Sequence, residues 1–125
     1  MKLRTLLIVA LVPSLTLVAG CATSSRFEWG NYEGALYAYA KKPDKREVYR
    51  NALQDAIERG RKTDRVAPGL LAELGYVDLE DGDLKDAIPL FQEEMRRFPE
   101  SRAFLTPVIA RAKTSGGGAG SSGNR

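Results

Sequence analysis

The sequence predicts an all-α fold of stacked antiparallel helix hairpins, with about five helices and a C-terminal capping helix. Three observations predict it. Apolar residues recur at helical spacing in successive segments between residues 31 and 113. No segment alternates polar and apolar residues for long enough to predict a β-strand. The breaks between segments are short and rich in glycine, proline and aspartate, so consecutive helices are expected to lie antiparallel, side by side.

The first 20 residues are predicted to be a signal peptide and no part of the fold. Lys2 and Arg4 precede an apolar stretch, and small residues precede Cys21, which is the only cysteine. The run Leu17-Val18-Ala19-Gly20-Cys21 resembles the lipobox of bacterial lipoproteins, and this resemblance implies cleavage before Cys21 and lipidation of Cys21. An uncleaved membrane helix and a plain secretory signal fit less well, because Pro13 interrupts a short apolar span and the cysteine stands at the cleavage point.

Residues 21–26 are predicted to form a lipidated tether. The protein is therefore expected to contact the membrane through the lipid on Cys21. No aspartate follows Cys21. In the lipoproteins that the lipobox resembles, an aspartate there retains the protein in the inner membrane, so its absence implies the outer membrane, facing the periplasm. Loss of Lys2 and Arg4 with the signal leaves a nearly neutral mature chain. No basic field remains that would indicate a nucleic-acid partner.

The helical domain is expected to span residues 27–113. An aromatic-rich helix follows Gly30 and ends at Lys41-Lys42, because the residue before Pro43 disfavours helix. A charged helix is predicted next, from Asp44 to Arg61. Asp44 is expected to cap its start, and Gly60 suits its C-terminus.

The clearest signal is a helix hairpin within residues 68–101. Gly82 is expected to end the first helix in the left-handed conformation, and Asp83 to cap the second. Pro89 lies inside the second helix, but the apolar stripe continues through it, so one helix is predicted. The expected core positions of the first helix are Leu70, Leu71, Leu74 and Val77.

Six residues of this hairpin share the spacing of a known two-helix repeat: Leu71, Leu74, Gly75, Ala87, Phe91 and Pro99. The hairpin therefore resembles a tetratricopeptide repeat (TPR), and the fold class is TPR-like. The resemblance implies a scaffold that binds another protein. Two positions depart from the repeat, since Asp78 replaces its tyrosine and Glu94 replaces a small residue.

The last helix is predicted from Arg102 to Lys113, with Ser101 as its cap and a kink or restart at Thr106-Pro107. Residues 114–125 are rich in glycine and serine, a composition that cannot bury a core, and are predicted to be a disordered tail.

The chain offers little for catalysis. It contains no histidine, its cysteine is assigned to the anchor, and no glycine-rich phosphate loop follows a strand. The acidic cluster from Asp78 to Asp86 does not match a calcium loop and is interpreted as a solvated turn. We therefore expect neither an enzyme nor a bound metal or cofactor.

Nearly the whole mature chain resembles a family of small uncharacterised outer-membrane lipoproteins of Gram-negative bacteria. The resemblance rests on the lipobox, the segment FEWGNYEGALYAY, the charged helix and the single hairpin. That family is often encoded beside a lipoprotein similar to the curli secretion channel and beside a second small lipoprotein. The resemblance implies protein partners in a shared envelope assembly, co-encoded lipoproteins among them, and carries over no functional residues.

The resulting hypothesis is a lipid-anchored periplasmic adaptor or scaffold. Its partner-binding surface is predicted on the first hairpin helix at Tyr76 and Leu79, with Ala72 between turns and Glu80 at the edge. Alternatively, the aromatic N-terminal helix covers Tyr76 and Leu79 within the same chain. Two other functions stay open: a structural lipoprotein that stabilises an envelope complex without a peptide groove, and a carrier of a small apolar ligand.

Overall fold

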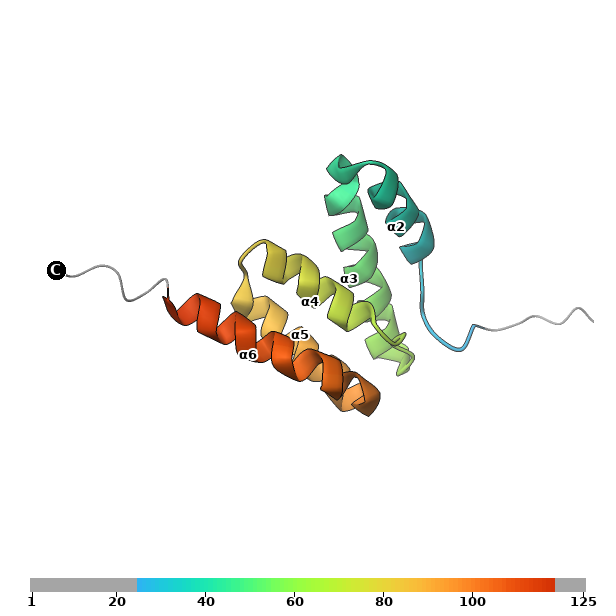
Figure 1. Ribbon diagram of the computed structural model, residues 1–125. Helices are drawn as coiled ribbons and strands as arrows, with labels where there is room; N and C mark the ends of the chain where they lie inside the picture. Colours follow the sequence, from blue (N-terminus) through green and yellow to red (C-terminus); the bar gives the residue numbers. More distant parts are fainter. Residues whose placement is uncertain (1–24, 119–125) are drawn as a thin grey trace, which may run out of the picture.

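The computed structural model describes residues 25–118 of the chain, and this part is all-α (Figure 1). Two short 3-10 turns, η2 and η3, accompany five α-helices: α2 (Tyr32–Lys41), α3 (Arg46–Thr63), α4 (Leu70–Glu80), α5 (Leu84–Arg97) and α6 (Arg102–Gly118). The predicted all-α fold with about five helices is confirmed. The signal peptide, Cys21 and residues 119–125 lie outside the described residues.

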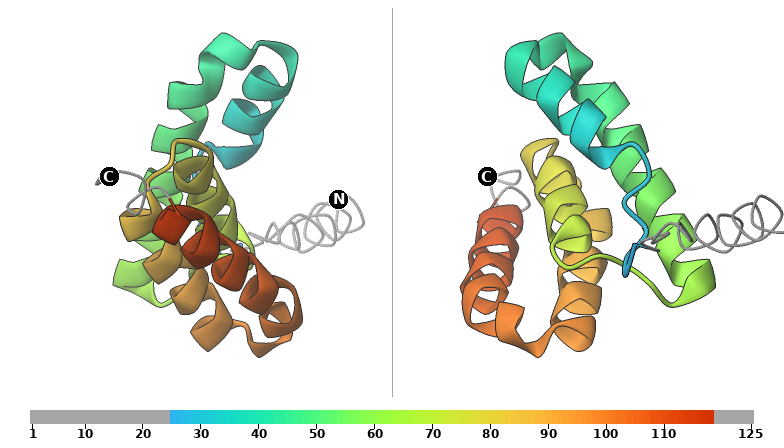
Figure 2. Two further views of the ribbon diagram at one scale, coloured as in Figure 1. Left: turned by 60° about the vertical axis from the view of Figure 1, so that its left-hand side comes forward. Right: turned by 90° about the vertical axis from the view of Figure 1, so that its right-hand side faces the viewer.

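The helices stack in the order of the sequence. α2 packs antiparallel on α3, α3 packs on α4, and α4, α5 and α6 lie side by side as a second group (Figures 1 and 2). A single β-bridge between Glu28 and Val66 ties the segment before α2 to the loop before α4. Within residues 25–118, none of the helices combines the length and apolar composition needed to span a bilayer.

The two ends of α3 differ from the prediction. Asp44 lies inside η2 (Pro43–Lys45), and α3 starts at Arg46 without a side-chain cap. The reason is Pro43, whose fixed φ starts a helical turn and takes Asp44 into it. At the other end α3 passes Gly60 and ends at Thr63, and the C-cap residue Asp64 has a φ of 52°.

Gly60 is a packing residue and not a helix terminator. It is buried, and a Cβ added there would lie 2.7 Å from the Cα of Val66. The loop that carries the β-bridge can lie against α3 only because Gly60 has no side chain. This close approach comes from a residue six positions later, so no local pattern indicates it.

The α4–α5 hairpin follows the prediction closely. Gly82 has a φ of +81°, and the Asp83 carboxylate accepts a hydrogen bond of 3.3 Å from the amide of Asp86. α5 runs through Pro89 as one helix. The predicted hairpin turn and caps are therefore confirmed.

α6 extends beyond its predicted limits. Ser101 lies in the η3 turn (Pro99–Ser101), and its hydroxyl donates to the carbonyl of Phe98 over 2.7 Å instead of capping α6. The helix passes Pro107 without a break and continues to Gly118, so the tail does not begin at Thr114. Ala112 is buried near the end of α6, and this packing helps explain why the helix persists into the glycine-rich stretch.

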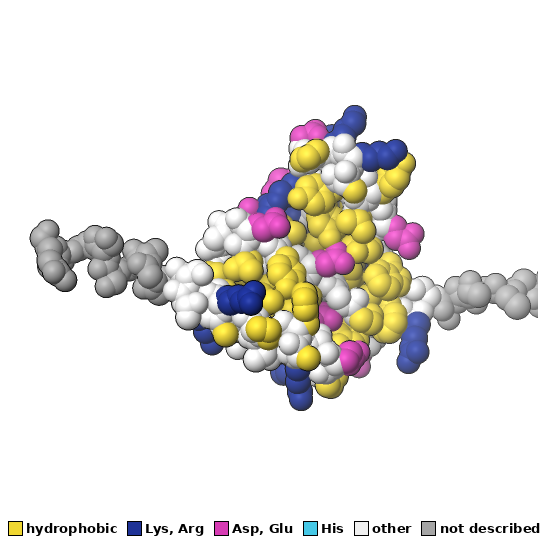
Figure 3. All heavy atoms as spheres, viewed as in Figure 1, with side chains coloured by type: hydrophobic (Ala, Val, Ile, Leu, Met, Phe, Trp, Pro, Cys, Tyr) yellow, Lys and Arg dark blue, Asp and Glu magenta, His cyan; other side chains and the backbone are white. Residues whose placement is uncertain are grey.

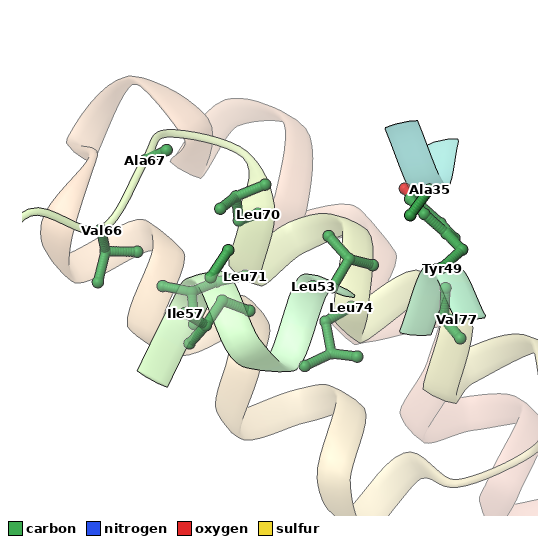
Figure 4. Close-up of a cluster of buried hydrophobic side chains, with 11 residues drawn as sticks. Ala35, Tyr49, Leu53, Ile57, Val66, Ala67, Leu70, Leu71, Leu74 and Val77 are labelled. Carbon is green, nitrogen blue, oxygen red and sulfur yellow. The ribbon is translucent and has the colours of Figure 1, made fainter. Parts of the chain in front are cut away.

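Two apolar clusters hold the stack together. In the first, side chains of α3 and α4 point toward one another, as Figure 4 shows for Leu53, Ile57, Leu71 and Leu74. All four predicted core residues of α4 belong to it, which confirms that part of the prediction. The cluster consists of Ala35, Tyr49, Leu53, Ala56, Ile57, Val66, Ala67, Leu70, Leu71, Leu74 and Val77.

The second cluster joins α5 to α6. Its buried members are Ala87, Phe91, Leu105 and Ile109. Phe91 fills space that Gly75 leaves open, since a Cβ on Gly75 would lie 2.7 Å from the Phe91 ring. Gly75 is thus small in order to admit an aromatic ring from the neighbouring helix.

Glu94, which differs from the small residue of the repeat that the hairpin resembles, caps the start of α4. Its side chain is 2% exposed, and its Oε1 accepts a 2.7 Å hydrogen bond from the amide of Gly69 at the start of α4. Burial raises the pKa of Glu94, and the Gly69 amide opposes that rise. A carboxylate at a helix N-terminus satisfies an otherwise unpaired backbone donor and complements the helix dipole.

Candidate functional site

An apolar groove lies between α4 and α6, at the end where α5 begins. Its volume is about 710 Å³. In the view of Figure 1, hydrophobic side chains gather over these helices (Figure 3). The groove is lined by Tyr76, Leu79, Gly82, Leu84, Phe104, Val108, Arg111, Ala112 and Ser115.

Each long wall of the groove is one face of a helix. α4 contributes Tyr76 and Leu79, which are three positions apart. α6 contributes a stripe from Phe104 to Ser115 at spacings of three and four residues. At 1.5 Å per residue, that stripe runs for about 16 Å along α6.

Aromatic rings line the groove beside the second cluster. The Tyr76 ring lies edge-on to Phe91, with 5.2 Å between centroids, and 6.3 Å from the ring of Phe104. Phe91 is fully buried, whereas Phe104 is 64% exposed. Burial raises the pKa of Tyr76, so its phenol stays a neutral hydrogen-bond donor at physiological pH. This part of the groove is an apolar aromatic surface that also carries the Tyr76 hydroxyl.

The predicted partner-binding residues separate into two groups. Tyr76 and Leu79 both line the groove. Ala72 packs on the second cluster and is not part of the lining, and Glu80 forms a 3.2 Å ion pair with Arg46 of α3. Geometry therefore brings two of the four predicted residues together and leaves the other two elsewhere.

The N-terminal aromatic segment packs elsewhere in the fold. Phe27, Trp29 and Tyr32 pack on the first cluster, whereas Tyr76 and Leu79 pack on the second. The helix beside Tyr76 and Leu79 is α6, and it leaves a groove open between itself and α4. The sequence indicated an apolar face on α6. It did not indicate which residues of α6 would lie across the groove from α4.

Among the described residues that line the groove, Arg111 is the only charged one. It forms no ion pair with any carboxylate of residues 25–118. The site therefore combines an extended apolar surface with one unpaired guanidinium.

The acidic turn after α4 is an ion-pair network and not simply a solvated loop. Asp78 is 7% exposed and pairs with Arg50, which also pairs with Asp81. Arg46 pairs with Asp81 at 2.8 Å, and its hydrogen bond to Asp81 holds the pKa of that carboxyl low. Asp78, where the repeat that this hairpin resembles has a tyrosine, thus fastens α4 to α3. Among the described residues, no group of acidic, cysteine or histidine side chains is arranged to hold a metal ion.

A second polar contact fastens α2 and α3 to α4. The Tyr32 hydroxyl donates to both oxygens of Glu73, at 2.8 and 2.9 Å, and the Tyr49 hydroxyl donates to Oε2 of the same carboxylate. Tyr49 also stacks on Tyr39 with 5.2 Å between ring centroids. Burial, followed by the hydrogen bond to Glu73, raises the pKa of Tyr32 to about 12 and raises the pKa of Tyr49 as well.

This contact predicts a loss of stability at alkaline pH. A raised tyrosine pKa means that the folded chain favours the neutral phenol, so the stabilisation is complete below the ordinary pKa of about 10 and is lost as pH rises toward 12. We expect the midpoint of urea unfolding to fall across that window. Tyr32→Phe should lower stability at neutral pH and make the alkaline loss shallower. An unchanged alkaline profile in Tyr32→Phe would contradict the assignment.

Residues 27–108 match the model of the family described as Domain of unknown function (DUF4810). The chain belongs to this family. The DUF4810 match includes α2 to α5 and the first part of α6, so both walls of the groove begin inside it. Arg111, Ala112 and Ser115 lie beyond its end. No curated protein and no solved structure matched the chain.

Proposed function

We propose that this protein is a lipid-anchored adaptor at the periplasmic face of the outer membrane and that it holds a segment of a partner protein in the α4–α6 groove. The observation that carries the proposal is the groove itself, a largely apolar hollow of about 710 Å³ that stays open on a small helical domain. Exposed apolar surface of this kind marks interaction sites. The Cys21 lipobox supports the anchor, and the TPR-like spacing of the hairpin supports a binding scaffold.

A protein segment fits the groove better than a small ligand does. A small-molecule site encloses most of its ligand, whereas here the α6 wall includes Phe104, which is 64% exposed. Tyr76 suits a protein interface because it gives a large, stiff contact with one polar handle. The proposed partners are envelope proteins, co-encoded lipoproteins among them. A structural lipoprotein that acts without a groove is the second candidate.

The test is photo-crosslinking in intact cells from a reactive residue placed at Phe104. A matched control carries the same residue at Ala103, which is exposed on α6 but does not line the groove. We expect a discrete protein adduct from position 104 and none from position 103. Equal adducts at both positions, or none at either, would remove the groove from the function.

The combination of Tyr76→Ala with Leu79→Ser is expected to abolish most of that adduct. These changes remove apolar surface from one wall of the groove. Tyr76 also contacts Phe91, so a modest loss of stability is expected too, and thermal unfolding of the same variant measures it separately. A variant that unfolds far below wild type would assign the pair to the core. One that gives the normal adduct would exclude the pair from the interface.

A further inference from the structure

The chemistry of the groove indicates which kind of protein segment binds there. This inference rests on the proposed function. The two long walls are helices, whose backbone N–H and C=O groups are already paired within α4 and α6. An extended peptide would find no strand edge along them to satisfy its own backbone groups. A helix satisfies its backbone internally and needs only a matching side-chain face, which is the helix-in-groove mode of recognition.

The length of the groove agrees with a helical occupant. The lining stripe of α6 from Phe104 to Ser115 covers about 16 Å, which is about three turns of a partner helix. Tyr76, Leu79 and Val108 present apolar surface to such a helix over this distance. A partner helix would therefore place a face of apolar side chains at spacings of three and four residues against the groove.

Arg111 adds a charge requirement. A helix docked in the groove would displace water from the guanidinium, and burying a charge is costly unless the occupant supplies a partner. None of the carboxylates of residues 25–118 pairs with it. We infer that the groove takes an amphipathic helix whose apolar face carries an acidic side chain where it meets Arg111.

The spacing on α6 also places that acidic side chain along the partner helix. Arg111 is seven residues from Phe104, which is about 10 Å or two helical turns. A partner helix that follows the groove along α6 crosses it at a small angle, as in the packing class with an interaxial angle of about 20°. The acidic residue of the occupant therefore lies about two turns from the apolar residue that contacts Phe104 and Tyr76.

The test uses displayed peptides and the mature lipoprotein in lipid nanodiscs. The probe is a library of amphipathic helices of about 15 residues, sorted into three sets by the residue two turns from the leading apolar position. That residue is Glu in one set, Gln in the second and Lys in the third. We expect the Glu set to be enriched roughly tenfold over the Gln set, with the Lys set weakest.

Two charge reversals on α6 give matched variants. Arg111→Glu should transfer the preference to the Lys set. Lys113→Glu should behave like wild type, because Lys113 is exposed two residues away and does not line the groove. Equal enrichment of the three sets, or a Glu preference that persists in Arg111→Glu, overturns the inference.

Two further outcomes separate this inference from the proposed function. A Phe104 adduct in cells together with no charge preference among the peptides leaves the adaptor role standing and removes the acidic helix. Selected peptides that still bind Phe104→Asp overturn the inference and exclude the groove as their binding site. Concentration-dependent self-association that Phe104→Asp abolishes would assign the groove to a second copy of this chain and overturn the inference as well.

Discussion

Replacing Phe91 with alanine is expected to lower the free energy of unfolding by roughly 3–5 kcal/mol. Phe91 is fully buried, and its ring occupies the space that Gly75 leaves open between α4 and α5. It also contacts the Tyr76 ring, with 5.2 Å between centroids. Removing the ring leaves a cavity that neighbouring helices cannot close without moving, so lost apolar burial and lost packing add together.

Urea unfolding followed by the helical circular dichroism signal measures this effect. Phe104→Ala is the matched control, because it removes the same side chain from the same region at a position that is 64% exposed. We expect the control to cost well under about 1 kcal/mol. Since small domains have a total stability of about 5–15 kcal/mol, Phe91→Ala is expected to leave the domain close to unfolding. Equal effects of the two substitutions would show that the second cluster does not stabilise the fold.

The proposed lipid anchor predicts the second large effect. Cys21→Ser removes the thiol that would be acylated if the lipobox-like run is recognised, so the chain should no longer be held in the membrane. Each buried acyl methylene contributes about 0.8 kcal/mol to membrane binding, and two or more chains give stable anchoring. We expect the wild-type protein in the outer-membrane fraction and the serine variant largely outside it.

Cell fractionation and intact mass measurement check this prediction together. The mass of wild type should correspond to a chain that begins at Cys21 and carries acyl groups. A control with Thr23→Ala changes a residue of the tether but leaves Cys21 intact, and it should fractionate like wild type. Wild-type protein that carries no acyl group would rule out the lipid anchor and the adaptor geometry that depends on it.

The groove was only partly predictable from the sequence. Helical spacing placed Tyr76 and Leu79 away from the core-facing residues of α4, and both line the groove. The same spacing grouped them with Ala72 and Glu80, which do not line it. Periodicity assigns residues to a face of one helix, but the partner of that face is set by the packing angle of another helix, which the pattern of one segment does not contain.

The sequence by itself determined the elements of this protein. Apolar periodicity located the helices, and Gly82 with Asp83 located the hairpin turn, because these features depend on interactions within a few residues of the chain. The lipobox-like run before Cys21 and the absence of histidine likewise need only composition and order. These features do not depend on how distant segments meet.

Only the tertiary structure decided the roles of residues that act across the fold. Gly60 looked like a helix end, yet it is small because the backbone of Val66 lies against it. Glu94 and Asp78 looked like departures from a repeat, yet one caps α4 and the other pairs with Arg50 of α3. Arg111 became part of the groove lining when the fold brought α6 and α4 to the two sides of the groove. Each of these roles is an interaction between residues of different elements, whose energy depends on distances that the linear order of residues does not specify.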